Sequence, residues 1–341
     1  MYTHTHTQVL GGIMSSSHLT NPDFAGFNRV YVHYCDGTSY AGDRDDPVVI
    51  NGTPVWFRGK RIMDAVFRAL TADFGFAIAK NVLVTGCSAG GLAAFLHADT
   101  IATWHLPPSV EKYGVAPISG FFLDVDNVQG VPVFPTEMRN LFGLANASGG
   151  VNQACIAAAP DPADRWRCFF AQSSFMHTVS PVFTLNSAVD MWQTSCVLAA
   201  TLPTGFPNTS ADMNKYCDDA PGWHACAFAG DCNASQVAVL SRFREDFMAE
   251  IESATFEKPG NGAFLHSCHT HCEAQDNAWN TFAIGGVTMQ QAVSRWWHDA
   301  PGAPAAPHTH RPCVYRASSN YTCNPTCCTF DELSRMVGPP C

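Results

Sequence analysis

The stretch Asn81-Val82-Leu83-Val84-Thr85-Gly86-Cys87-Ser88-Ala89-Gly90-Gly91 decides the fold. A short apolar, β-branched run meets Gly-x-Ser-x-Gly, and an alanine-rich segment with helix-forming residues follows at 92–102. This order predicts a strand, a sharp turn and a helix, the arrangement of a nucleophile elbow. The turn would strain the serine backbone, and Gly86 and Gly90 would let the strand and the helix pass closely. Ser88 is therefore a candidate nucleophile, although a bare Gly-x-Ser-x-Gly is common and also fits an ordinary strand-to-helix turn.

The composition excludes several classes of protein. The chain has 341 residues, of which 46% are hydrophobic and 14% are charged, enough for a core in one large or two ordinary domains. A formal charge of −10 with only 19 Lys and Arg disfavours nucleic acid or anionic membrane surfaces as partners. No apolar run reaches the roughly 18 residues of a membrane helix, so we expect no membrane insertion.

The cysteines and glycosylation motifs indicate an oxidising compartment. The chain has 15 cysteines, an odd number, which leaves at least one thiol unpaired or paired outside the chain. Asn-x-Ser/Thr motifs occur at Asn51, Asn146, Asn208, Asn233 and Asn320. Together these features predict a disulfide-rich, secreted glycoprotein. The first residues show neither a basic region nor an apolar core of a signal peptide, and we interpret the chain as N-terminally truncated.

Hydrophobic patterns along the chain alternate between strands and helices. We predict strands at 29–34, 48–50, 55–57, 81–85, 115–123, 181–186 and 262–265, and helices at 59–74, 92–102, 135–144, 235–254 and 289–297. Asn51-Gly52 predicts a hairpin between the second and third strands. Residues 201–232 and the Pro- and Cys-rich tail read as loops. The alternation predicts an α/β fold with a mostly parallel sheet flanked by helices.

Three reactive side chains follow predicted strands. Ligands in such sheets bind beyond the carboxyl ends of the strands, where Ser88, Asp190 and His271 are expected. A serine hydroxyl needs an imidazole to take its proton, and a buried carboxylate must orient that imidazole. The order Ser, Asp, His is that of α/β-hydrolases. Asp190 also fits a helix N-cap, and His266 and His269 are rivals of His271 that we expect to line the loop or to satisfy backbone groups.

The run His266-Ser-Cys-His-Thr-His-Cys272 also suggests zinc, because His and Cys ligands lie close together there. Cys323, Cys327 and Cys328 could complete such a site. We favour disulfides for Cys268 and Cys272, because an oxidising compartment promotes them and ligands this close rarely all point at one metal. We therefore expect no metal and no cofactor.

Motifs in the same order over nearly the whole chain resemble those of the pectin acetylesterase family, which includes Notum. The matching stretches are Asn21-Pro22-Asp23-Phe24, Asn28-Arg29-Val30, Tyr34-Cys35-Asp36-Gly37, Phe57-Arg58-Gly59, Gly86-Cys87-Ser88-Ala89-Gly90-Gly91, Gly120-Phe121-Phe122-Leu123-Asp124, Asp190-x-Trp192-Gln193, Ser267-Cys268-x-x-His271-Cys272 and Cys323-Asn324-Pro325-Thr326-Cys327. The resemblance implies one α/β-hydrolase domain over 1–341, with Ser88 as nucleophile, Asp190 as orienting acid and His271 as base.

The resemblance also implies what the site would act on. We expect an acetyl ester hydrolase that acts on cell-wall polysaccharide as a monomer, with Ala89 donating an oxyanion-hole N–H. Asp36, Gly37, Trp192 and Gln193 are expected to bind substrate, and Asp43 is expected near the pocket.

One departure from the family leaves two alternatives open. Relatives carry an early Gly-Gly-Gly-Trp-Cys stretch that supplies oxyanion donors, and this chain starts after it; Gly11-Gly12 is the only nearby pair. Loss of one oxyanion donor costs about 10²–10³-fold in rate. The alternatives are a catalytically impaired carbohydrate-binding relative and a Notum-like deacylase of lipidated protein, which would need a deep apolar pocket. The missing segment should also leave an open sheet edge.

Overall fold

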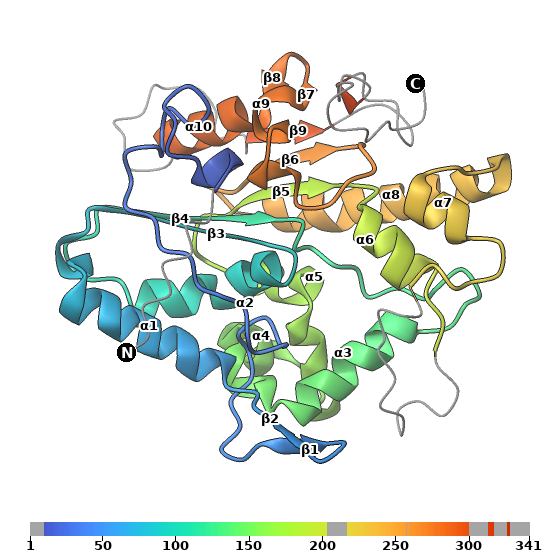
Figure 1. Cartoon of the computed structure of the whole chain (residues 1–341), viewed down its shortest axis with the longest axis horizontal. Helices are drawn as coiled ribbons and strands as arrows, with labels where there is room; N and C mark the ends of the chain where they lie inside the picture. Colours follow the sequence, from blue (N-terminus) through green and yellow to red (C-terminus); the bar gives the residue numbers. More distant parts are fainter. Residues whose placement is uncertain (1–9, 203–216, 257, 300–312, 317–325, 328–341) are drawn as a thin grey trace.

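A five-stranded parallel sheet forms the centre of the protein in the computed structural model (Figure 1). The structure describes residues 10–202, 217–256, 258–299, 313–316 and 326–327. The sheet order is β3-β4-β5-β6-β9. Its strands are β3 (Asn81–Cys87), β4 (Lys112–Ile118), β5 (Phe183–Ser187), β6 (Gly262–His266) and β9 (Cys313–Arg316). The parallel sheet and its place between helices confirm the predicted fold class.

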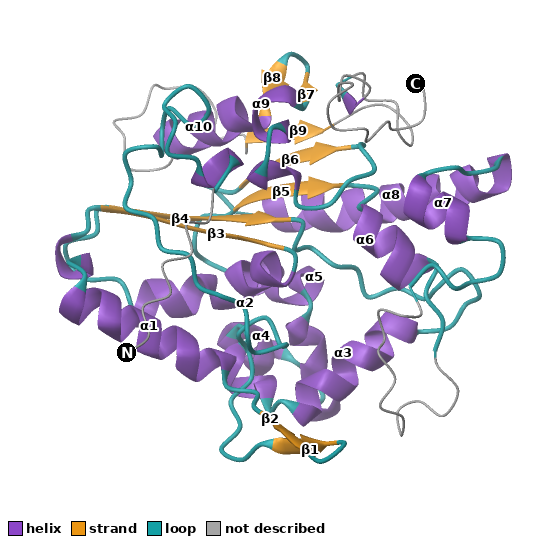
Figure 2. Ribbon diagram, in the orientation of Figure 1, coloured by secondary structure: helices purple, strands orange, loops and turns teal. Residues whose placement is uncertain are grey.

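Helices cover both faces of the sheet (Figure 2). Side chains on neighbouring positions of a strand point to opposite faces, so Ala263 and Leu265 enter one core and Phe264 the other. The first core lies under α2 and α8, and the second under α9 and α10. The helices are α1 (Gly59–Asp73), α2 (Ala89–Trp104), α3 (Val133–Leu144), α4 (Gln153–Ala158), α5 (Ala171–Ser174), α6 (Met191–Gln193), α7 (His224–Ala229), α8 (Ala234–Phe256), α9 (Ala278–Thr281) and α10 (Met289–Asp299).

Two small hairpins lie outside the main sheet. β1 (Val48–Ile50) pairs antiparallel with β2 (Thr53–Val55), and β7 (Ala283–Ile284) with β8 (Val287–Thr288). The first was predicted from Asn51-Gly52, and both of these residues have positive φ, 49° and 78°, as the tight turn requires.

The predicted strand at 29–34 is wrong. Its alternating pattern suggested a half-buried strand, but Val30, Tyr31, Val32 and Tyr34 are all exposed and the segment pairs with no other strand of the described chain. The Tyr40 hydroxyl donates to backbone carbonyls at 32 and 33 instead.

Two other segments also differ from the sequence-based expectation. The strand expected at 115–123 ends at Ile118, because Ser119 takes a positive φ of 47° and turns the chain away. The sequence does not predict β9, which is short and follows a Pro-rich stretch. The described part of the expected 201–232 loop contains α7.

Close backbone packing places the turn at Ser88. A side chain at Gly86 would lie 2.5 Å from the Gly90 carbonyl oxygen, and one at Gly120 would lie 2.2 Å from the carbonyl carbon of Gly91. Gly86 thus allows the close passage of strand and helix that the sequence predicts. A side chain at Gly90 would meet open space, so this glycine does not have the predicted role. Gly91 makes the close contact with the sheet instead. β3, which leads into this turn, forms one edge of the described sheet.

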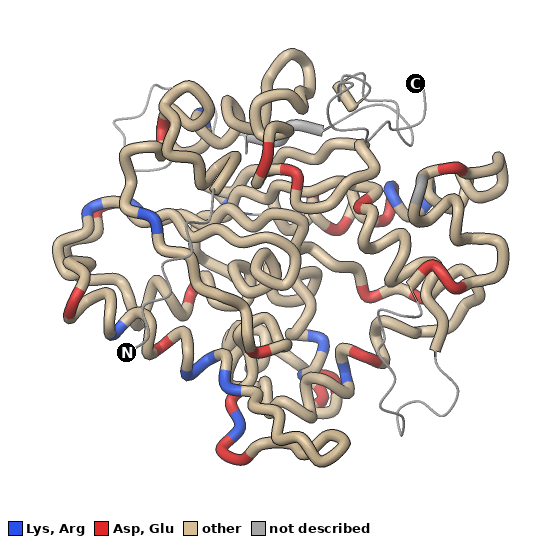
Figure 3. The backbone as a smooth tube through the Cα atoms, viewed as in Figure 1, with Lys and Arg blue, Asp and Glu red and all other residues tan. Residues whose placement is uncertain are grey.

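Lys and Arg are sparse on the fold and lie among acidic residues (Figure 3). On α1, Lys60 and Arg61 lie beside Asp43, and Arg61 also pairs with Asp45. None of the described helices is both long enough and apolar enough to cross a membrane.

Candidate active site

Ser88 lies at a strained turn between β3 and α2. Its φ of 58° and ψ of −122° fall in a region that serine rarely adopts. The turn is fixed because Ser88 N donates to the Ile118 carbonyl at 3.0 Å and Leu92 N donates to the Ser88 carbonyl at 2.8 Å. Ala89 begins α2, so its N–H has no carbonyl four residues earlier to bond within the helix and lies at the positive end of the helix dipole. The predicted succession of strand, sharp turn and helix is therefore present.

Asp190 and His271 form a hydrogen-bonded pair beyond the ends of neighbouring strands. His271 Nδ1 lies 2.8 Å from Asp190 Oδ2, and Asp190 is fully buried. The other carboxylate oxygen, Oδ1, accepts from Gln193 N at 3.0 Å, so Asp190 also caps α6. The N-cap role and the pairing with His271 are thus compatible rather than exclusive.

Asp190 changes the pKa of the His271 imidazole and fixes which ring nitrogen carries the proton. Burial lowers the pKa of the imidazole, but the charge and hydrogen bond of Asp190, together with the charge of Glu273, outweigh burial and raise that pKa above its usual value. Because Nδ1 donates to Asp190, the other ring nitrogen, Nε2, is the one able to accept a proton. This Nε2 is buried and has no hydrogen-bond partner among the described residues.

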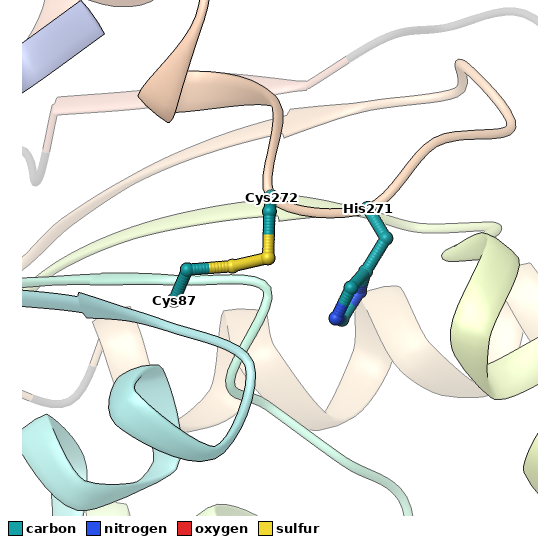
Figure 4. Close-up of side chains that lie close together, drawn as sticks. All are labelled: Cys87, His271 and Cys272. Carbon is teal, nitrogen blue, oxygen red and sulfur yellow. A yellow bond between two sulfur atoms is a disulfide. The ribbon is translucent and has the colours of Figure 1, made fainter. Parts of the chain in front are cut away.

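A disulfide joins the turn at Ser88 to the loop after β6 that carries His271 (Figure 4). It links Cys87, the residue before Ser88, to Cys272, the residue after His271, across 185 positions of sequence. A ring nitrogen of His271 lies within 4.8 Å of both sulfur atoms. The disulfide therefore holds Ser88 and His271 together at the carboxyl ends of the strands.

The zinc alternative loses three of its candidate thiolate ligands, Cys268, Cys272 and Cys327. Cys272 is bonded to Cys87, and Cys268 is bonded to Cys327. A disulfide sulfur does not act as a thiolate. The other proposed ligands, Cys323 and Cys328, lie outside the described residues.

The two rival histidines have other partners. His266 is fully buried and its Nε2 lies 2.8 Å from Glu273 Oε1. His269 Nε2 lies 2.9 Å from Thr194 Oγ1, and burial lowers the pKa of His269 to about 4, so its ring is neutral. Among the three, only His271 bonds Asp190 in the described structure.

A cavity of about 370 Å³ opens beside Ser88. Its lining is mostly aromatic and aliphatic, with Tyr34, Gly37, Thr38, Ser39, Ser88, Ala89, Leu92, Phe122, Phe134, Glu137, Met138, Leu141, Phe169, Trp192, Cys196, Ala200 and Cys217. Among the described residues of this lining, Glu137 is the one with an acidic side chain. Burial raises the pKa of its carboxyl to about 7, so its charge changes near neutral pH.

The four predicted substrate-binding residues fall into two groups. Gly37 and Trp192 line the cavity, and the Trp192 ring lies 6.4 Å from the His271 ring. Asp36 is buried, and its carboxylate accepts from Gly59 N and Thr38 N, at 2.6 and 3.1 Å. It thereby holds the 36–42 loop against the start of α1 instead of facing the cavity.

Gln193 has a similar supporting position. Its side-chain oxygen accepts from Leu123 N and its nitrogen donates to the Phe121 carbonyl, both at 3.1 Å. The structure thus corrects the expectation of substrate contact for Asp36 and Gln193, because their polar atoms are used by the backbone. Asp43 lies away from the cavity lining and pairs with Lys60 and Arg61.

Sequence reasoning missed three residues of this region, Ser119, Glu137 and Glu273. For Glu273 the sequence offers one signal, its position two residues after His271, because a carboxylate so near a reactive histidine can interact with it. Ser119 and Glu137 have no motif of their own. Their placement depends on the turn after β4 and on how α3 packs over the cavity.

Comparison with known proteins identifies one family along nearly the whole chain. The family model described as Pectinacetylesterase matches residues 2–328. Pectin acetylesterase 5 of Arabidopsis thaliana is 32% identical over 321 residues, covering 93% of this chain and 67% of the relative. Palmitoleoyl-protein carboxylesterase NOTUM of Mus musculus is 29% identical over 340 residues, covering 96% of this chain and 60% of the relative.

A solved structure shows the same fold. The Wnt deacylase Notum from Drosophila superimposes with a TM-score of 0.72 and 18% identity, covering 95% of this chain and 81% of the other. At this identity the likeness concerns the fold, a Notum-like α/β-hydrolase.

We predict that the Cys87–Cys272 disulfide stabilises the protein more than a short-range one. Cross-linking across 185 positions removes more unfolded-state entropy than across the 6 positions of Cys226–Cys232. In the chain-entropy model, Cys87→Ala/Cys272→Ala should cost about 5 kcal/mol of unfolding free energy and Cys226→Ala/Cys232→Ala about 2 kcal/mol. Urea unfolding of both double variants, with the remaining disulfides intact, measures the difference. Equal losses would contradict the prediction.

Proposed function

The chain belongs to the pectinacetylesterase family and is a carboxylic ester hydrolase, and from this premise we propose that it is a serine esterase of acetylated cell-wall polysaccharide. The observation that carries the proposal is the hydrogen bond between part-buried His271 and buried Asp190, tied by the Cys87–Cys272 disulfide to the strained turn of Ser88. The name of the Arabidopsis relative, a pectin acetylesterase, supports the substrate class.

The proposed reaction proceeds in two steps. His271 Nε2 takes the hydroxyl proton of Ser88 while Oγ attacks the acetyl carbonyl, and the same proton then goes to the leaving sugar oxygen. Water activated by His271 hydrolyses the acetyl-enzyme and releases acetate. Asp190 keeps Nδ1 protonated and stabilises the imidazolium. The Ala89 N–H at the start of α2 donates to the oxyanion.

Location and modification are part of the proposal. Ten described cysteines form five disulfides, which is typical of secreted proteins. Among the glycosylation motifs, Asn51, Asn146 and Asn233 are exposed, whereas Asn208 and Asn320 lie outside the described residues. An extracellular, glycosylated esterase fits these features.

We predict that activity depends on Ser88 and on a neutral His271. Ser88→Ala should lower kcat on a small acetyl ester and on acetylated pectin by about 10⁴-fold or more. Because the pKa of His271 is raised, activity should fall on acidification with a midpoint above about 6.5. Asp190→Asn should move this midpoint to lower pH and lower kcat by about 10⁴-fold, whereas Asp246→Asn, an exposed control on α8, should change neither. Equal rates for wild type and Ser88→Ala would sink the proposal.

We predict that Glu137 disfavours acidic sugars at high pH. Its carboxyl, with a pKa of about 7, becomes negative as pH rises through neutrality and repels a uronate in the cavity. Repulsion of about 1 kcal/mol should lower the rate on acetylated galacturonate relative to acetylated xylose oligomers by about fivefold between pH 6 and 8. Glu137→Gln should abolish this change in ratio. The same pH dependence in both proteins would refute the role of Glu137.

A second candidate function is removal of a longer acyl chain, as the name of the NOTUM relative describes for that protein. It is favoured by one observation, the aromatic and aliphatic lining of a cavity of about 370 Å³. A series of esters from C2 to C8 separates the two functions. An acetylesterase should turn over C2 fastest, and faster hydrolysis of C8 would support the deacylase.

A third reading, the catalytically impaired carbohydrate-binding relative, remains distinct from both. It predicts binding of acetylated oligosaccharide with no acetate release and no effect of Ser88→Ala. The comparison of wild type with Ser88→Ala therefore tests it directly.

A further inference from the structure

A second buried histidine–carboxylate pair lies beside the proposed catalytic pair. His266 Nε2 and Glu273 Oε1 are 2.8 Å apart, and both side chains have an exposed fraction of 0%. His266 is the last residue of β6, and Glu273 follows His271 by two positions. The proposed reaction uses neither residue. A carboxylate this deeply buried is costly unless its oxygens are paired, so the partners of both oxygens need an explanation.

The two oxygens of Glu273 are both bonded. The Cys268 N–H donates to His266 Nδ1 at 3.2 Å, so Nε2 carries the proton and donates to Glu273 Oε1. The Ser119 hydroxyl donates to Oε2 at 3.2 Å. The same hydroxyl accepts from the backbone N–H of Cys272 at 3.0 Å. A continuous chain of hydrogen bonds thus leads from His266 through Glu273 and Ser119 to the backbone beside His271.

Three consecutive residues are therefore fixed to different strand ends. His271 bonds Asp190 after β5, Cys272 is bonded to Cys87 at the end of β3, and Glu273 bonds His266 at the end of β6 and Ser119 after β4. Cys272 has a φ of 67°, which turns the chain so that its two neighbours point to different partners.

We infer that Glu273 is a positioning residue for His271: its carboxylate, held by His266 and Ser119, fixes the turn at Cys272 that aims the imidazole at Ser88. The inference rests on the proposed role of His271 as the base. Glu273 touches neither substrate nor the reacting atoms, and no proton moves to it; the proton of Ser88 stays on His271 until it goes to the leaving group.

The charge of Glu273 gives the role a measurable signature. Burial raises the pKa of the Glu273 carboxyl, but interaction with His266 outweighs burial and holds that pKa below its usual value, so the group is ionised. Its negative charge is one of the causes that raise the pKa of His271, after Asp190. The charged or titratable groups that interact with these two residues are Asp190, His266 and Asp276. Removing the charge of Glu273 should therefore lower the pKa of His271.

The first test is an NMR titration of the His271 ring in wild type and in Glu273→Gln. The signal can be assigned among 14 histidines by its absence from His271→Gln. Glu273→Gln keeps the size of the side chain and removes its charge, and should lower the midpoint of His271 by about 1 pH unit. Glu250→Gln, the same change at an exposed position of α8, should leave it unchanged. This measurement requires no ester hydrolysis, so it stays informative if the proposed function fails.

The second test is kinetic and uses Ser119→Ala with a small acetyl ester. This variant keeps the carboxylate but cuts the link from Glu273 to the Cys272 N–H. It should lower kcat by about 10- to 100-fold, the range expected for a reacting group misplaced by about 1 Å. KM should be nearly unchanged. The His271 midpoint should stay within a few tenths of a pH unit of the wild-type value, because the charge of Glu273 is kept. A purely electrostatic role would leave kcat of Ser119→Ala at the wild-type value.

Each outcome decides the inference. A lowered His271 midpoint in Glu273→Gln together with a lowered kcat in Ser119→Ala supports it. An unchanged midpoint, or wild-type kcat in a folded Ser119→Ala, overturns it. If thermal unfolding shows that both variants fail to fold, the pair serves the stability of the fold and the inference is also overturned. Absence of acetyl ester hydrolysis in wild type sinks the proposed function alone.

Discussion

The site depends on one three-residue segment, His271-Cys272-Glu273, which is tied to the ends of four strands. Its ties are of different kinds: a histidine–carboxylate hydrogen bond, a disulfide and a buried network that ends on a backbone N–H. Strand ends of a parallel sheet are held by many ladder bonds, so they form a rigid frame for such a segment. The frame explains how side chains far apart in sequence are held close to one another at this site.

The sequence predicts those parts of this arrangement that follow from local pattern. The apolar run before Ser88, the small residues around it and the helix former after it specify strand, turn and helix within one short stretch. Asp190 and His271 were placed at strand ends because parallel strands finish at a common edge. Placing these residues near strand ends needs only chain order and periodicity, and β3, β5 and β6 do end shortly before them, whereas the choice of His271 over His266 and His269 rests on the family resemblance.

Other features depend on tertiary packing and could not be predicted. The segment 29–34 alternates like a strand, but a strand also requires a partner, and the described chain offers it none. Asp36 and Gln193 look like substrate ligands from their motifs, yet backbone amides bond their polar atoms. Glu137 reaches the cavity only through the packing of α3, which no motif encodes. A motif therefore identifies reactive residue types better than it separates residues facing substrate from residues facing backbone.

The disulfide between Cys87 and Cys272 bears on the order in which the protein is made. Synthesis produces the nucleophile turn first and the histidine loop 185 positions later, after β4 and β5. The covalent link can therefore close only when most of the chain has been synthesised and has met an oxidant. Before that stage no cross-link joins the turn at Ser88 to the segment of His271, so covalent closure of the candidate site is a late event in the maturation of the protein.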